Sequence, residues 1–178
     1  MSKKICIAID AMGGENAPYK NIEGIYLFWK KNKKGNDFFF NIFGDEQKVN
    51  SELKKYNIPE MCYKIFHTPS TVSDNETPLT AVKTSKNSSM WNSVYSQVKS
   101  ESDISLSAGN TGVLLVISRM ILKTINGVSK PALAGLWPNL NGMNIVLDLG
   151  ANIECDEKNL IEFSEMGSAL HKSLFPTV

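Results

Sequence analysis

Short apolar runs alternate along the chain with longer segments in which apolar residues recur every three or four positions. Residues 4–9 form a β-branched apolar run that predicts a buried strand, and residues 36–43 predict a second strand. Pro18 is suited to begin a helix between them, because its missing N–H is not needed at a helix start. Asp45 is suited to cap the helix that follows the second strand. The first helix has an apolar face made of Ile22, Ile25, Tyr26 and Trp29.

The same alternation continues through the rest of the chain. Further strands are predicted at residues 61–66, 104–108, 132–137 and 144–149, and residues 68–77 read as an exposed loop. Helices are predicted over residues 78–99, with a break near 87–89, and over residues 110–122 and 157–172. The last helix is expected to bury Leu160, Ile161, Phe163 and Met166. Because strands that alternate with helices favour right-handed crossovers, the sequence predicts a doubly wound α/β fold whose largely parallel sheet is covered on both faces.

Composition narrows the class of protein. The 178 residues carry 19 Lys and Arg against 18 Asp and Glu, with no tail of one charge sign, so a nucleic-acid partner is not expected. A chain of this length suits a single domain, which we place over residues 1–178. The longest run of large apolar residues, 113–117, is far shorter than the ~20 residues of a membrane-spanning helix. The apolar run near the N-terminus is too short for a signal peptide, so a cytoplasmic protein is expected.

The cysteines and histidines do not indicate a metal site. Cys6, Cys62 and Cys155 are odd in number and lack C-x-x-C spacing, and the two histidines are isolated in sequence. We therefore expect no metal site.

Three predicted strands end in polar loops that contain glycine: residues 10–18, 107–112 and 148–152. In doubly wound sheets, ligands bind beyond the carboxyl ends of the strands, where glycine allows close approach and helix starts present N–H groups to anions. The second loop is the best anion site of the three, because it opens a helix and adds Ser107, Asn110 and Thr111 as donors. Asp10 and Asp148 each end a strand, where a carboxylate orients donors or accepts a proton. Together the loops favour a site for a phosphate-like group, although each alone is more often a tight turn.

Two lysines precede a serine pair in the middle of the chain. Lys83 and Lys86 lie three residues apart on one helical turn, just before Ser88 and Ser89. Such a pair is commonly a solvated face. The alternative is that it faces an acidic partner or an anionic substrate.

Six short motifs occur in a fixed order over nearly the whole chain. They are D-A-M-G-G-E-N-A-P (10–18), S-S-M (88–90), S-A-G-N-T-G (107–112), P-A (131–132), D-L-G-A-N (148–152) and M-G (166–167). In this order they resemble the PlsX family, the phosphate acyltransferases of bacterial phospholipid synthesis. The resemblance implies a three-layer α/β/α Rossmann-like fold with a mostly parallel sheet, akin to the phosphotransacetylases. It also implies a homodimer.

The resemblance further implies a reaction and its partners. A long-chain acyl group would pass from acyl carrier protein to inorganic phosphate, and a membrane acyltransferase would then use the acyl phosphate. Such a protein would be cytoplasmic, or peripheral at the membrane. No cofactor is implied.

The resemblance also implies a role for each candidate site residue in this reaction. Asn110 and Asp10 are the expected catalytic residues, and Lys83 and Lys86 the expected contacts to the carrier protein. The expected substrate- or phosphate-binding residues are Gly13, Gly14, Asn16, Ser88, Ser89, Ser107, Gly109, Thr111, Gly112, Asp148 and Asn152. Their N–H groups, amides and hydroxyls would hold the phosphate and stabilise the oxyanion, without a protein nucleophile.

The chain also departs from the family pattern. Glu15 stands in place of an expected Asp, and Lys83 and Lys130 stand in place of expected Arg, which removes bidentate phosphate contacts. Members of the family are longer than this chain, and residues 171–178 depart from the family pattern in the way that a truncation or a frameshift produces. We therefore expect this chain to form the N-terminal portion of the family fold. Three interpretations stay open: an acyltransferase, an inactive fragment that binds phosphate or carrier protein, and a dehydrogenase of related architecture. The absence of G-x-G-x-x-G speaks against the third.

Overall fold

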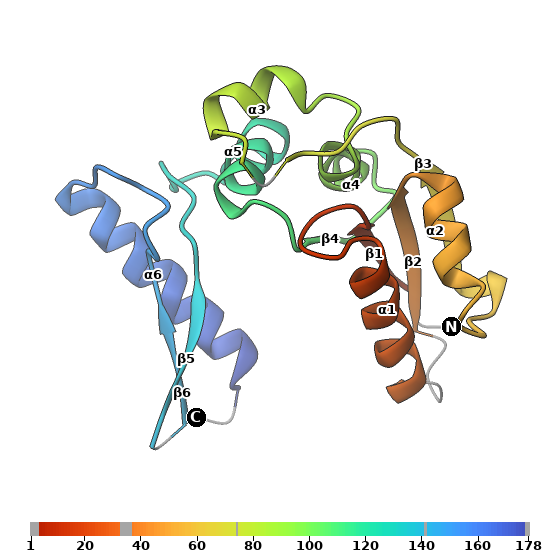
Figure 1. The fold of residues 1–178 in the computed structure, drawn as a ribbon. Coiled ribbons are helices and arrows are strands. Elements are labelled where there is room, and N and C mark those ends of the chain that lie inside the picture. Colours follow the sequence, from red (N-terminus) through yellow and green to blue (C-terminus); the bar gives the residue numbers. More distant parts are fainter. Residues whose placement is uncertain (1–3, 33–36, 74, 141, 177–178) are drawn as a thin grey trace. The chain divides into compact units, whose positions relative to one another are not determined.

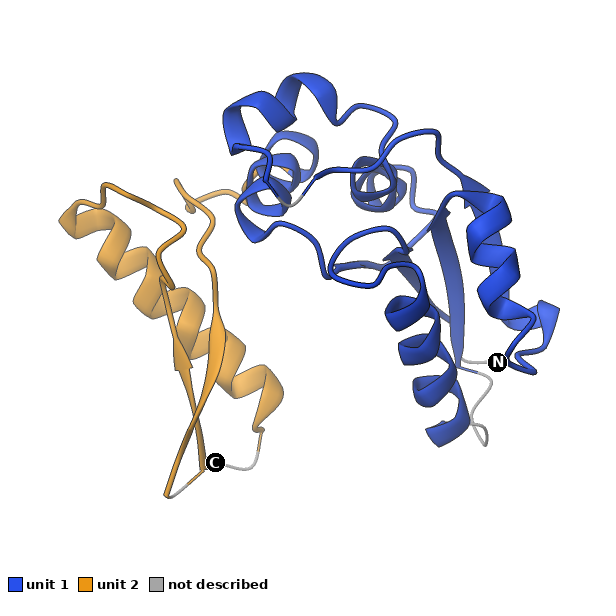
Figure 2. Ribbon diagram, viewed as in Figure 1, with its two compact units in different colours: residues 1–122 blue, residues 123–178 orange. Residues whose placement is uncertain are grey.

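The structure, a computed structural model, describes residues 4–32, 37–73, 75–140 and 142–176. It contains two compact units, residues 1–122 and residues 123–178 (Figure 2). The single domain expected over residues 1–178 stays a prediction.

The first unit is built on a four-stranded parallel sheet (Figure 1). Its strands are β1 (Ile5–Asp10), β2 (Phe38–Gly44), β3 (Tyr63–His67) and β4 (Ile104–Ser107), in the order β3-β2-β1-β4. Its helices are α1 (Tyr19–Lys31), α2 (Glu46–Leu53), α3 (Pro78–Thr84), α4 (Ser89–Val98) and α5 (Thr111–Leu122), with a short 3-10 turn η1 (Glu60–Cys62) before β3. The predicted α/β class and the mostly parallel sheet are confirmed.

Two apolar clusters hold this unit together. On one side of the sheet, Ile22 and Ile25 of α1 pack with Ile9 and Ile42 of the strands and Val49 of α2. The second cluster joins α3, α4 and α5 through Ala81, Met90, Val94, Val113 and Ile117. The predicted cap is also confirmed, because Asp45 Oδ1 accepts a hydrogen bond from the Lys48 N–H at 3.1 Å.

Helices lie on both faces of the sheet as expected, with α1 and α2 on one face and α4 on the other, but one face of the edge strand β4 is not covered within this unit. Ile104 and Leu106 are 51% and 60% exposed. They line an open apolar groove of about 400 Å³ beside α1, together with Ile7 and Phe28. The reason is that α1 packs on β1 and β2, and within the described part of this unit no other helix lies on that face of β4.

The second unit differs from its prediction. Residues 132–137 and 144–149 were expected to be strands of the parallel sheet, but β5 (Gly135–Asn139) and β6 (Gly142–Val146) pair with each other in an antiparallel hairpin. Strands this close in the chain can only pair antiparallel, because a parallel pair needs a long crossover. The hairpin contacts the helix α6 (Glu157–Leu174).

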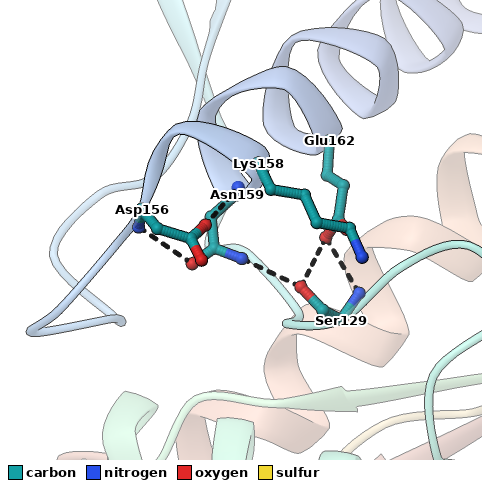
Figure 3. Close-up of polar contacts among 5 residues, drawn as sticks. All are labelled: Ser129, Asp156, Lys158, Asn159 and Glu162. Atoms are coloured by element: carbon teal, nitrogen blue, oxygen red, sulfur yellow. Dashed lines mark hydrogen bonds and ion pairs between the residues drawn. The ribbon is translucent and has the colours of Figure 1, made fainter.

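The buried face of α6 agrees with its prediction only in part, because Phe163 is buried as expected but its predicted neighbours are not. Leu160 and Ile161 are 59% and 61% exposed, whereas Asn159, Glu162 and Phe163 are buried. The physical reason is a polar cluster at the start of the helix (Figure 3). Glu162 Oε2 accepts hydrogen bonds from the N–H and the hydroxyl of Ser129 at 2.8 and 2.7 Å, and Asn159 Nδ2 donates to Ser129 Oγ at 2.9 Å. These bonds turn the polar side of α6 toward residue 129.

In the described residues, no helix is long and apolar enough to span a bilayer.

Candidate functional site

The first two glycine loops lie side by side at the carboxyl ends of β1 and β4, and a direct hydrogen bond that the sequence did not predict joins them. Asp10 ends β1 and is 1% exposed, and Ser107 ends β4 beside it. The Ser107 hydroxyl donates to Asp10 Oδ2 at 2.6 Å, and the Met12 N–H donates to Asp10 Oδ1 at 3.2 Å. Both oxygens of Asp10 therefore accept hydrogen bonds from protein donors, and its carboxyl group ties the two loops together.

Glycine is required where these loops meet. A Cβ on Gly13 would lie 2.5 Å from Asp10 Oδ2 and 2.9 Å from the Gly109 nitrogen. Gly14 has a φ of +87°, and a Cβ there would lie 2.6 Å from the Ala108 carbonyl oxygen. The backbones of the two loops are therefore in contact, and neither position has room for a side chain.

The second loop uses several of its own donors internally. The Gly109 N–H donates to Ser107 Oγ at 3.1 Å. Asn110 caps α5, because its Oδ1 accepts a hydrogen bond from the Val113 N–H at 3.1 Å, and its Nδ2 donates to the Glu76 carbonyl at 3.2 Å. Thr111 is exposed in the first turn of α5, and Gly112 follows it. The sequence alone did not show that the Gly109 N–H and the Asn110 amide have protein partners.

The start of α4 meets the same loops. A Cβ on Gly109 would lie 2.9 Å from Met90 Cε, so Met90 packs against the second loop. Ser88 caps α4 by accepting a hydrogen bond from the Trp91 N–H at 3.1 Å. Ser89 is 1% exposed, and its Oγ has no hydrogen-bond partner among the described residues. A buried hydroxyl without a partner is costly, which favours a ligand group at this position.

The remaining predicted residues of the first unit lie on its surface. Asn16 is exposed in the first loop with a φ of 60°, and its carbonyl accepts a hydrogen bond from the Lys20 N–H at 3.2 Å. Lys83 in α3 and Lys86 after it are both exposed.

The third loop belongs to the second unit, where it is tied to residues 131–133. Asp148 Oδ1 accepts a hydrogen bond from the Leu133 N–H at 2.7 Å, and Oδ2 accepts one from the Asn152 N–H at 2.7 Å. Asn152 Nδ2 donates to the Pro131 carbonyl at 2.8 Å. Burial raises the pKa of Asp148, but these backbone and amide donors outweigh it and hold the pKa below its usual range. Asp148 and Asn152 therefore shape this loop.

One residue at the site was missed by sequence reasoning. Asn21, in the first turn of α1, donates hydrogen bonds from Nδ2 to the carbonyls of Ala11 and Gly13, both at 2.9 Å. A polar side chain one helical turn after a glycine loop was the available signal. Among the described residues, no group of three or more His, Cys, Asp and Glu is arranged to hold a metal ion.

Several known proteins are similar to this chain. The phosphate acyltransferase of Pelagibacter ubique is 51% identical over 99% of this chain and 51% of its own length. That of Rhodospirillum rubrum is 38% identical over all of this chain and 51% of its own length, so the chain spans about half the length of these curated relatives. The EutD phosphotransacetylase from Staphylococcus aureus has a similar fold, with a TM-score of 0.59 and 19% identity over 90% of this chain and 50% of that chain. The family described as fatty acid synthesis protein matches residues 5–177, and the chain belongs to this family.

Proposed function

We propose that this chain forms the phosphate-binding part of an acyltransferase that transfers a long-chain acyl group from acyl carrier protein to inorganic phosphate. The observation that carries the proposal is the junction of the two glycine loops by Asp10 and Ser107, next to the N-terminal ends of α4 and α5. Helix N-termini and unpaired N–H groups attract anions, so this junction suits a phosphate ion.

The proposed reaction needs binding and orientation more than a protein nucleophile. An oxygen of hydrogen phosphate forms a bond to the thioester carbonyl carbon, the C–S bond breaks, and the phosphate proton ends on the released thiol. The site must hold the phosphate close to the carbonyl and stabilise the oxyanion that forms. The buried Ser89 hydroxyl, the Gly14 N–H and the exposed first turn of α5 are the groups of the described structure best placed to do so.

The roles of individual residues follow from their hydrogen bonds. Asp10 and Ser107 position the loops, and Ser88 holds the start of α4. Asn110 is proposed as a positioning residue, because as the cap of α5 it orients the first turn of that helix. Gly13, Gly112 and Asn16 shape the loops around the phosphate, and Asp148 and Asn152 shape the third loop.

Exposed cations and family membership support the proposed partners. Lys83 and Lys86 are exposed cations that suit an acidic carrier protein. Membership of the family supports a role in phospholipid synthesis. We extend this to a cytoplasmic homodimer, peripheral at the membrane, that supplies acyl phosphate to a membrane acyltransferase.

A second function is supported by the length of the relatives. Because the chain spans about half of each curated relative, a folded chain that binds phosphate or carrier protein without turnover is the alternative. The relatives found are phosphate acyltransferases, so we do not propose a dehydrogenase.

Two measurements on the purified chain test the proposal. The first is phosphate binding by titration calorimetry, and the second is acyl-phosphate formation from long-chain acyl carrier protein and phosphate. We expect Ser107→Ala to weaken phosphate binding, whereas Ser51→Ala, which removes an exposed hydroxyl that donates to the Lys48 carbonyl at 2.8 Å, should not. Binding without turnover would support the fragment alternative. A folded chain that does neither would refute both functions.

A further inference from the structure

Asn21 contacts the first glycine loop through both protons of its amide. Its Nδ2 donates to the Ala11 carbonyl and to the Gly13 carbonyl, each at 2.9 Å. The side chain is partly buried and comes from the first turn of α1, so it is held by a regular element rather than by the loop. Two carbonyls separated by one residue are therefore directed toward the same helix.

Because the peptide bond is planar, the orientation of these two carbonyls also fixes the orientation of the N–H groups that follow them. In a trans peptide, the C=O of one residue and the N–H of the next point in opposite directions. The cis peptides of the described chain follow Ala17 and Leu147, so the bonds after Ala11 and Gly13 are trans. Consistent with this, the Met12 N–H points to Asp10 Oδ1, at 3.2 Å. By the same rule the Gly14 N–H points away from α1.

The Gly14 N–H is the donor that this arrangement leaves open. Within the described residues it has no protein acceptor. The peptide that carries it joins two glycines, so no side chain of its own residues fixes its orientation. The hydrogen bond from Asn21 to the Gly13 carbonyl is what selects one of the two orientations.

We propose that Asn21 is a positioning residue that directs the Gly14 N–H toward a bound phosphate. The proposal rests on the phosphate site of the proposed function. Asn21 does not touch the phosphate itself. Its effect reaches the ligand through the orientation of one peptide.

The test is a phosphate titration of the ¹⁵N-labelled full chain followed by NMR. In the wild-type chain, we expect the Gly14 amide resonance to shift with phosphate and to saturate. Asn21→Leu keeps the size of the side chain, removes its hydrogen-bond donors and adds no charge. It should raise the Kd for phosphate about tenfold or more, as the loss of one hydrogen bond to a charged group does, and should abolish the Gly14 response.

A matched control is available at the C-cap of the same helix. Asn32 Nδ2 donates to the Phe28 carbonyl at 2.8 Å, so Asn32→Ala removes a comparable bond far from the loop. It should leave the Kd and the Gly14 response unchanged. Circular dichroism establishes that each variant folds, and Asn21→Ala takes the place of Asn21→Leu if the leucine does not fit.

The outcomes separate the two claims. If the wild-type chain binds phosphate and both Asn21 variants bind it with the same Kd and the same Gly14 shift, the positioning role is wrong and the phosphate site stands. If the folded wild-type chain binds no phosphate, the site and the role of Asn21 are both wrong.

Discussion

Removing the Ser107 hydroxyl should lower the free energy of unfolding of the first unit by a measurable amount. The hydroxyl donates to the buried carboxyl group of Asp10 at 2.6 Å and accepts from the Gly109 N–H at 3.1 Å. Hydrogen bonds to charged groups contribute about 1.5–3 kcal/mol, and Asp10 is 1% exposed, so water cannot replace the lost donor. For Ser107→Ala we therefore expect the free energy of unfolding to fall by about 2 kcal/mol, with the second bond adding little.

Native-state hydrogen exchange of the β1 amides measures this change within the first unit alone. A loss of about 2 kcal/mol corresponds to exchange about 30-fold faster. Ser51→Ala is the control, because its exposed hydroxyl donates only to the Lys48 carbonyl, and it should change stability by less than about 0.5 kcal/mol. If Ser107→Ala also changed β1 exchange by less than about 0.5 kcal/mol, the link between the loops would not contribute as argued.

Three further predictions concern the loops, the caps and the second unit. Gly14→Ala should destabilise the first unit and abolish phosphate binding, because the φ of Gly14 is +87° and the new Cβ would lie 2.6 Å from the Ala108 carbonyl oxygen. Gly24→Ala is the control, because a Cβ there would have nothing within 4 Å, and it should stabilise the protein by about 0.5–1 kcal/mol. Thermal unfolding measures both changes. Ser88→Ala should cost about 1 kcal/mol by removing the cap of α4, measured by urea unfolding, and an unchanged midpoint would contradict the capping role. Hydrogen bonds from the hydroxyl of Ser129, and to a smaller extent from its N–H, hold the pKa of Glu162 below its usual 4.5. The contribution of these bonds to stability is therefore present above pH 4.5 and is lost as the pH falls through the lowered pKa. The protection factors of the α6 amides, in which the intrinsic pH dependence of exchange is removed, should therefore fall in acid, and Glu162→Gln should flatten that dependence. Equal pH profiles of the protection factors in the two proteins would refute the argument.

Local features of the sequence were sufficient for the elements of the first unit and for the glycine loops. Apolar periodicity and turn residues act over a few positions, so they placed the strands of the parallel sheet and the capping role of Asp45. Glycines after β1 and β4 indicated where two loops of the site lie, because parallel strands bring their carboxyl ends to one edge. The same local signals do not distinguish a strand that joins the parallel sheet from one that pairs with its neighbour. For this reason β5 and β6 were predicted correctly as strands, but their antiparallel pairing was not.

Only the tertiary structure decided which polar groups already have partners. Asp10 and Ser107 are 97 residues apart in the chain, and no local pattern encodes their hydrogen bond. The same holds for Ser129 and Glu162, whose pairing turned the polar side of α6 inward against its apolar periodicity. Periodicity determines which residues lie on one face of an element. The direction in which that face packs, and the donors it leaves for a ligand, depend on contacts between distant segments.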